Sequence, residues 1–179
     1  MDGVQLFLSA TLETFEANKR MADRAIAQVT DEMLRIPLDA NTNSIAVIMK
    51  HVAGNLTSRW TDFLTTDGEK PNRNRDGEFV DEFSDRAELL QCWERGWDCL
   101  RNSLKSLTPD DCNKEVTIRG EPHTVPLALQ RSLAHTCYHV GQIVQAARVH
   151  AKDQWETLTI PRGQSAQFNN AKWSQSKKT

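Results

Sequence analysis

Two histidines, His135 and His139, lie four residues apart in the apolar segment SLAHTCYHVGQIV at 132–144. Residues four apart on an α-helix share a face, with Cβ atoms about 5–6 Å apart, so their imidazole nitrogens can converge on one point. His51 borders the hydrophobic stripe of a second apolar segment, IMKHVAGN. Three inward-facing imidazoles would lose hydration, and protonating more than one would bring like charges together. A divalent cation is the simplest partner for such a group.

Metal binding through three neutral imidazoles leaves at least one position for water or substrate, as in catalytic rather than structural sites. Imidazole binds zinc, nickel, copper and iron, so the ligand type does not select the ion. The residues alone also allow hydrogen-bonded core histidines, or surface histidines, that hold no metal. The other two histidines are weaker candidates. His150 is expected to end a helix, where a cation suits the helix dipole, and His123 is expected in a hairpin loop.

Five polar side chains are expected around this site, as orienting or substrate-contacting groups: Asn55, Arg59, Arg131, Tyr138 and Gln142. Asn55 and Gln142 can orient imidazole N–H groups, because metal-bound histidines usually need such partners, although capping or bundle hydrogen bonds would explain them equally well. Arg59 can hold an anionic substrate group with its planar guanidinium, or pair with Asp62 or an acidic loop residue. Tyr138 can donate to a bound oxyanion or simply fill space. No general base is assigned.

Hydrophobic periodicity predicts four helices, at residues 4–29, 43–64, 84 to about 104, and 124–151. Asn43 or Ser44 is expected to cap the second helix, and Thr124 the fourth, with Pro126 in its first turn. Gly96, inside the third helix, costs about 1 kcal/mol relative to alanine and therefore indicates close backbone packing.

Four amphipathic helices can bury their stripes only against one another, which predicts an all-α four-helix bundle in a single domain, residues 1–179. A charged segment of about 20 residues between the second and third helices predicts a long crossover at the surface. The segment EVTIRGEPHTV predicts a small hairpin before the fourth helix. The C-terminal tail lacks helical periodicity and is expected to lie extended over the bundle, with Arg162 and Phe168 either closing over the site or packing on the surface. Its last residues, SQSKKT, are expected to be frayed.

Composition and net charge restrict the classes of binding partner to be expected. Lysine and arginine number 22 against 24 acidic residues, and the net charge of −2 gives no electrostatic reason to expect nucleic acid or an acidic membrane. No run approaches the roughly 18 apolar residues of a spanning helix, and no signal peptide is recognisable, so a cytoplasmic protein with a small-molecule ligand is expected. The four scattered cysteines are interpreted as reduced thiols, since no basic cluster favours a nucleophilic thiolate.

The three histidine positions, and the longer runs NSIAVIMKHVAGNLTSRWTDFLTTDGEKPNRNRDGEF, VTIRGEPHTV, LAHTCYHVGQIV and IPRGQSAQFN, resemble a bacterial branch of the DinB-like superfamily. The resemblance covers nearly the whole chain. It implies a four-helix bundle, often dimeric, with His51, His135 and His139 as ligands of a divalent metal, commonly nickel or zinc. Activities of other branches suggest metal-dependent transfer of a low-molecular-weight thiol, or maleylpyruvate isomerisation with a thiol cofactor. No thiol-binding residue carries over by position.

The resulting expectation is a homodimeric, metal-dependent enzyme that acts on a small molecule as a transferase, isomerase or hydrolase. The ion would lower the pKa of a bound water or thiol, or polarise a carbonyl. The alternative is a bundle that binds metal or a small ligand without turnover, as a sensor or an interaction module. Exposure of the site separates the two, because catalysis needs an open coordination position.

Overall fold

The computed structural model describes residues 3–176, so the last three residues of the segment expected to fray lie outside it. Its helices and strands follow in chain order: α1 (Gly3–Ile26), α2 (Asp31–Arg35), α3 (Ile45–Trp60), the 3-10 helix η1 (Asp76–Phe79), α4 (Arg86–Ser106), η2 (Pro109–Asn113), β1 (Glu115–Ile118), β2 (Glu121–Thr124), α5 (Val125–Ala151), η3 (Lys152–Gln154) and α6 (Ser165–Ser176). The all-α class is confirmed.

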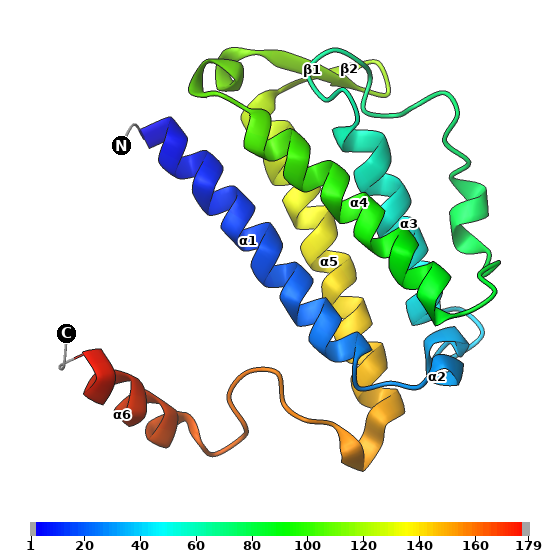
Figure 1. The fold of residues 1–179 in the computed structure, drawn as a ribbon, viewed down its shortest axis with the longest axis vertical. Helices are drawn as coiled ribbons and strands as arrows, with labels where there is room; N and C mark the ends of the chain where they lie inside the picture. Colours follow the sequence, from blue (N-terminus) through cyan, green and yellow to red (C-terminus); the bar gives the residue numbers. More distant parts are fainter. Residues whose placement is uncertain (1–2, 177–179) are drawn as a thin grey trace.

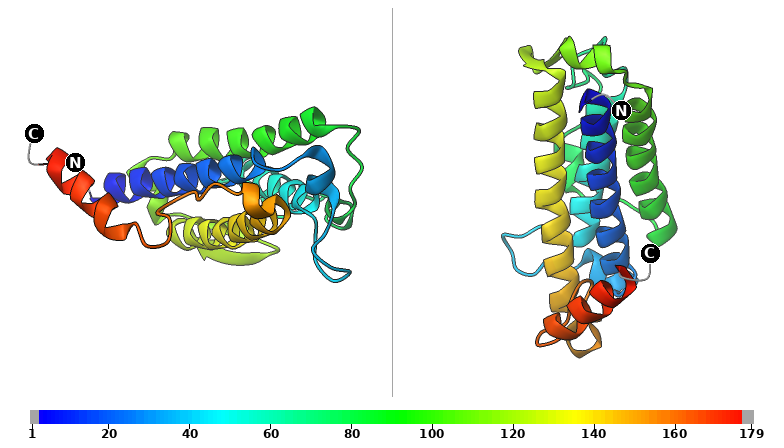
Figure 2. Two further views of the ribbon diagram at one scale, coloured as in Figure 1. Left: turned by 90° about the horizontal axis from the view of Figure 1, so that it is seen from below. Right: turned by 90° about the vertical axis from the view of Figure 1, so that its left-hand side faces the viewer.

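Four long helices, α1, α3, α4 and α5, lie side by side (Figures 1 and 2). The antiparallel hairpin of β1 and β2 lies across one end of these helices, with Val116 opposite His123. The crossover from α3 to α4 runs along the outside of α3 and includes η1 (Figure 1). None of the helices that the structure describes has both the length and the hydrophobicity needed to cross a membrane.

The helix starts follow the expected capping residues. The Ser44 hydroxyl accepts from the backbone N–H of Val47, and the Thr124 hydroxyl accepts from that of Leu127. Each bond satisfies a backbone donor that the first helical turn leaves free. The second predicted helix ends earlier than expected, at Trp60, because Thr61 is extended and Asp62 has a φ of 47°. That left-handed conformation cannot continue a right-handed helix.

Aromatic side chains fill the space between the long helices. Phe15 of α1 meets Trp97 of α4 edge to face, with ring centroids 6.5 Å apart, and Trp97 meets Trp93 in the same way at 5.4 Å. All three are fully buried. Gly96 lies beside this cluster, and a Cβ atom there would be 2.7 Å from the Cα of Ala53 on α3. The glycine is therefore what lets the backbones of α3 and α4 approach each other, as its position predicted.

Replacing Gly96 with alanine is expected to lower the free energy of unfolding by at least about 1 kcal/mol, because the clash with backbone outweighs the gain in helix propensity. Urea unfolding measures this difference. Gly141→Ala on α5 is the matched control, since a Cβ atom there meets nothing within 4 Å. The control should be neutral or stabilising. A Gly96→Ala protein as stable as the wild type would show that the two backbones are not in close contact.

Further local features differ from the sequence-based expectations. The short helix α2, capped by Thr30, and the 3-10 helix η1 were not predicted, because both are too short to show periodicity. The prediction of an extended tail is wrong for residues 165–176, which form α6. Helix α6 lies apart from the four long helices (Figure 1), and the side chains described there, including Phe168 at 42 % exposure, face solvent. It has no hydrophobic stripe, which is why helical periodicity was not visible.

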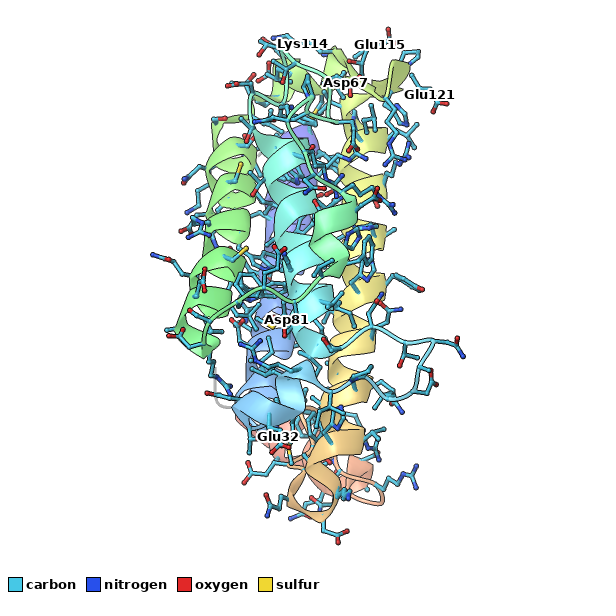
Figure 3. The ribbon with its side chains drawn as sticks, turned by 90° about the vertical axis from the view of Figure 1, so that its right-hand side faces the viewer. Glu32, Asp67, Asp81, Lys114, Glu115 and Glu121 are labelled. Carbon is cyan, nitrogen blue, oxygen red and sulfur yellow. The ribbon has the colours of Figure 1, made fainter. Side chains whose placement is uncertain are left out.

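Asp67 fastens the crossover to the hairpin (Figure 3). Its carboxylate accepts the backbone N–H groups of Glu69, Arg119 and Gly120 at 2.7–2.8 Å. Gly68 adds a backbone bond to Thr117 at 2.8 Å. Burial opposes ionisation of Asp67, but the three backbone donors outweigh it and hold its pKa well below the usual 3.8.

Because the folded-state pKa of Asp67 is depressed, its contribution to stability is present above about pH 4 and is lost as the pH falls further. Asp67→Asn should therefore lower the melting temperature at pH 7, and the difference from wild type should shrink between pH 4 and pH 2. Thermal unfolding followed by circular dichroism across this range is the measurement. A difference that stays constant with pH would contradict an ionised Asp67 as the fastening group.

Candidate metal centre

The three histidines singled out in the sequence converge in the structure. His51 comes from α3, and His135 and His139 come from successive turns of α5. Each offers one ring nitrogen, and these three atoms all lie within 4.8 Å of one another. We call these residues the histidine triad. The i, i+4 spacing aligns the two α5 rings, while the packing of α3 against α5 brings His51 to the same point.

The spacing of the triad nitrogens fits a common metal ion. Nε2 of His135 is 3.3 Å from Nε2 of His51 and 3.2 Å from Nε2 of His139. Imidazole nitrogens at about 2.0–2.1 Å from a tetrahedral ion would lie about 3.3–3.4 Å from one another. The two pairs that include His135 therefore have nearly the separation that coordination requires, and the third pair lies within 4.8 Å.

Hydrogen bonds from the outer ring nitrogens point the Nε2 lone pairs inward. His51 donates its Nδ1–H to Oε2 of Glu78 at 2.9 Å, and His139 donates its Nδ1–H to Oε1 of Gln142 at 2.7 Å. Neutral rings held in this way carry lone pairs on Nε2. Nε2 of His135 lies between them and can donate a proton to only one. A cation at the centre would satisfy all three.

Glu78 is the acidic partner of His51 and is itself buried. Arg73 donates to both its carboxylate oxygens, from Nε at 2.7 Å and from Nη2 at 2.8 Å. Burial raises the pKa of Glu78, but the hydrogen bonds from His51 and Arg73 and the charge of Arg73 outweigh it, so the pKa stays below the usual 4.5. Glu78 is therefore a charged acceptor, which would make His51 a more basic ligand if a metal ion bound there.

Gly54 makes room for this carboxylate. A Cβ atom on Gly54 would lie 2.7 Å from Cδ of Glu78, so a larger residue would displace Glu78 from His51. Gly54 lies one helical turn after His51, on the side of α3 that η1 covers. A glycine in the middle of an amphipathic helix was the sequence signal for this contact, and sequence reasoning did not use it.

Burial keeps the two α5 imidazoles neutral. It lowers the pKa of His135 to about 3, with further lowering from the neighbouring His139 and His51. Burial also lowers the pKa of His139, against the opposing hydrogen bond with Gln142. A neutral imidazole is the form that binds metal. Nδ1 of His135 is buried without a hydrogen-bond partner, so the protein provides an orienting acceptor for two of the three triad rings.

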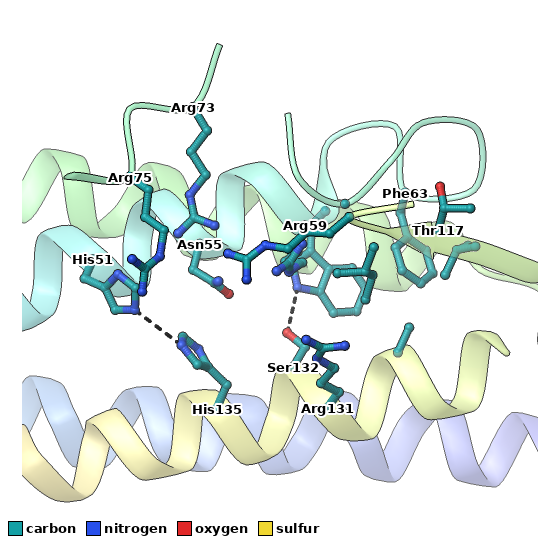
Figure 4. Close-up of a pocket in the computed structure, with 16 residues that line it drawn as sticks. His51, Asn55, Arg59, Phe63, Arg73, Arg75, Thr117, Arg131, Ser132 and His135 are labelled. Atoms are coloured by element: carbon teal, nitrogen blue, oxygen red, sulfur yellow. Dashed lines mark hydrogen bonds between the residues drawn. The ribbon is translucent and has the colours of Figure 1, made fainter. Parts of the chain in front are cut away.

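A cavity of about 210 Å³ adjoins the triad on the side of His51 and His135 (Figure 4). It lies between α3, α5 and the hairpin, with Trp60, Phe63, Val116 and Ile118 as apolar wall. Trp60 donates its Nε1–H to Ser132 at 3.2 Å and so links α3 to α5 beside the cavity. A small molecule in this space would reach the triad directly.

Four of the five predicted polar residues hydrogen-bond to the triad or line the cavity. Gln142 contacts His139, and Asn55, Arg59 and Arg131 line the cavity. Arg59 also lies 3.5 Å from the carboxylate of the loop residue Glu69, the kind of pairing expected as its alternative. Tyr138 does neither. Its ring is beside that of His139 at 4.9 Å, but the side chain is 63 % exposed and does not line the cavity.

Besides Gly54, three residues near the site were missed or misjudged. Glu78 and Arg73 lie in the crossover, where charge alone suggested a solvated surface loop. His123, expected in a hairpin loop, is instead a buried residue of strand β2. It donates from Nδ1 to the carbonyl of Glu121 and accepts from Arg131 at Nε2. Only the alternation of apolar and polar residues across the hairpin could have indicated that His123 points inward.

The cysteines lie outside this site. All four are unpaired thiols, and none lines the cavity. Burial raises the pKa of Cys92, Cys112 and Cys137, which disfavours the nucleophilic thiolate. Reduced, unreactive thiols were expected from the sequence.

These features define a class: an all-α protein with three converging histidines beside an arginine-lined cavity. The chain belongs to the family described as "Protein of unknown function (DUF1572)", whose sequence model matches residues 2–164. The match includes the histidine triad, Glu78 and the hairpin, and it ends immediately before α6. No protein with a curated description matches the chain.

Proposed function

We propose that this protein is a metal-dependent enzyme of the DinB-like superfamily that acts on a small molecule. His51, His135 and His139 are the ligands of a divalent ion, with nickel or zinc as the proposed metal. The observation that supports this most directly is the convergence of the three imidazoles: Nε2 of His135 lies 3.2–3.3 Å from the other two Nε2 atoms, and one ring nitrogen from each histidine lies within 4.8 Å of the others. The adjoining cavity supports a substrate rather than a purely structural role.

Different residues of the chain have different roles at this site. The triad would hold the ion, and Glu78 and Gln142 orient the rings of His51 and His139 through their Nδ1 atoms. An ion held by three protein ligands would supply Lewis acidity to a bound water or substrate. Transfer, isomerisation and hydrolysis are all compatible with such a site. A low-molecular-weight thiol is a proposed cosubstrate, and a homodimer is the proposed assembly.

A second candidate is a bundle that binds metal or a small ligand without turnover. It is favoured by one observation: the described lining of the cavity contains no carboxylate, thiol or tyrosine that would act as general base or nucleophile. Under this candidate the site would serve sensing or interaction. Nucleic acid and membranes are not proposed as partners of either candidate, because the net charge of −2 offers them no attraction.

Cobalt(II) substitution separates the two candidates. The wild-type protein should bind about one equivalent of cobalt and show the visible absorption of a four- or five-coordinate ion. Addition of a small thiol should shift these bands if a coordination position is open. Bands that do not respond to thiol, azide or other small ligands would indicate a closed site and favour binding without turnover. Failure to bind cobalt or zinc at all would exclude both metal-based candidates.

A further inference from the structure

Arginines dominate the polar lining of the cavity beside the triad. Their guanidinium groups come from α3, the crossover, the hairpin and α5, and Figure 4 shows several of them around the space next to His51 and His135. The five are Arg59, Arg73, Arg75, Arg119 and Arg131. No aspartate or glutamate is among the described residues that line this cavity. Five positive charges thus meet around a space too small for a large ligand.

Nearby carboxylates neutralise only part of this charge. Glu69 is shared by Arg59, Arg73 and Arg119, and Glu78 is paired with Arg73. Within the described part of the chain, Arg75 and Arg131 form no ion pair. Arg75 lies over the ring of Phe79, and Arg131 donates to the neutral Nε2 of His123 at 2.7 Å. The cavity therefore keeps an excess of positive charge.

Arg59 has unused hydrogen-bonding capacity at the centre of this group. Its side chain is 13 % exposed, and its Nη1 atom is buried without any hydrogen-bond partner. Burial lowers its pKa, and the neighbouring Arg73, Arg119 and Arg131 lower it further against the opposing charge of Glu69. A buried guanidinium nitrogen without an acceptor is costly, and a bound oxyanion would supply that acceptor.

Arg131 is positioned by the hairpin rather than neutralised by it. His123 donates its Nδ1–H to the Glu121 carbonyl at 3.0 Å, so its Nε2 lone pair faces Nη1 of Arg131. This contact positions the guanidinium beside the cavity that Arg131 lines and leaves its remaining donors available. Strand β2 thereby fixes the position of one of the arginines that line the cavity.

We propose that this cavity binds a small organic oxyanion, a carboxylate or phosphate with an apolar body, through Arg59 and Arg131. The apolar wall formed by Trp60, Phe63, Val116 and Ile118 accommodates the body, and the arginine forks bind the charged groups. One consequence of this inference rests on the proposed function: if the triad binds a catalytic metal ion, the substrate of that ion is an anion. Anion binding itself is independent of the metal.

The test is calorimetric titration of succinate, inorganic phosphate and the neutral analogue succinamide into zinc-loaded and metal-free protein. Wild type should bind succinate or phosphate in both forms, and the stronger of the two identifies the recognised group. Succinamide should not bind detectably. Arg131→Met and Arg59→Met should each weaken binding about tenfold or more, through the loss of charge-assisted hydrogen bonds. Arg59→Lys keeps the positive charge but removes the planar guanidinium group, and it is the second variant if Arg59→Met does not fold.

Arg148→Met is the matched control. It removes the same charge from an exposed position on α5, about 25 Å along the helix from Arg131, and should leave binding unchanged. Equal anion affinity in wild type and in the folded Arg131 and Arg59 variants would overturn the proposal. Anion binding that requires zinc and is unchanged in both arginine variants would also overturn the proposal, because the zinc ion itself would then be the binding site. Loss of zinc uptake alone would refute the proposed function and leave the metal-free titration interpretable.

Discussion

His135→Ala is expected to lose stoichiometric zinc or nickel binding, with affinity reduced by more than about 100-fold, because even loss of a partner that orients a ligand costs about 10- to 100-fold. His135 is the central member of the triad, within 3.3 Å of both other Nε2 atoms. Its removal leaves two ligands on opposite helices. Elemental analysis after dialysis, and competition with a chromophoric chelator, would measure the loss.

His150→Ala is the control for this experiment. His150 lies on the same helix, about 16 Å beyond His139, and donates to the carbonyl of Ile36 instead of facing the triad. It should retain full metal binding. The wild-type protein should also gain thermal stability with added metal, about 2.7 kcal/mol at 100 times the dissociation constant, and His135→Ala should not. Equal metal content and affinity in His135→Ala and wild type would refute the proposed ligand set.

Glu78→Ala is expected to destabilise the metal-free protein by about 3–5 kcal/mol, the usual result of removing one partner of a buried ion pair. The side chains of Arg73 and Glu78 are only 4 % and 8 % exposed, and Glu78 also accepts from His51. The same change should weaken metal binding about 10- to 100-fold, because His51 loses its orienting acceptor. Urea unfolding of metal-free protein and chelator competition measure the two effects separately.

Two companion variants make this prediction sharper. Glu78→Gln keeps an acceptor for His51 but removes the charge opposite Arg73, so it should lose more stability than metal affinity. Glu82→Ala removes an exposed carboxylate of the same crossover, which pairs with Lys50 at 3.1 Å and is 71 % exposed, and should change stability by less than about 1 kcal/mol. If Glu78→Ala behaved like Glu82→Ala in both measurements, the crossover would have no role in supporting the site.

Local sequence determined much of this architecture. Apolar residues at intervals of three and four predicted the four long helices, because only helices with this period can bury a continuous stripe. Ser44 and Thr124 marked two helix starts through capping, and Gly96 marked the close approach of two backbones. The spacing of His135 and His139 already placed both imidazoles on one face, since helical geometry alone sets that relation.

Only the tertiary structure decided what surrounds the histidines. Glu78 reaches His51 across 27 residues of chain, and His51 reaches His135 across 84, so no local period could encode either contact. Of the five arginines around the cavity, the sequence predicted Arg59 and Arg131 at the site but not the other three. Arg73, Arg75 and Arg119 join them only because the crossover and the hairpin fold back over α3 and α5. Helix α6 could not be predicted for a different reason: it has no apolar stripe, so its sequence shows no helical periodicity. Sequence period thus reports which face of a helix is buried, whereas packing between distant segments determines which polar groups meet.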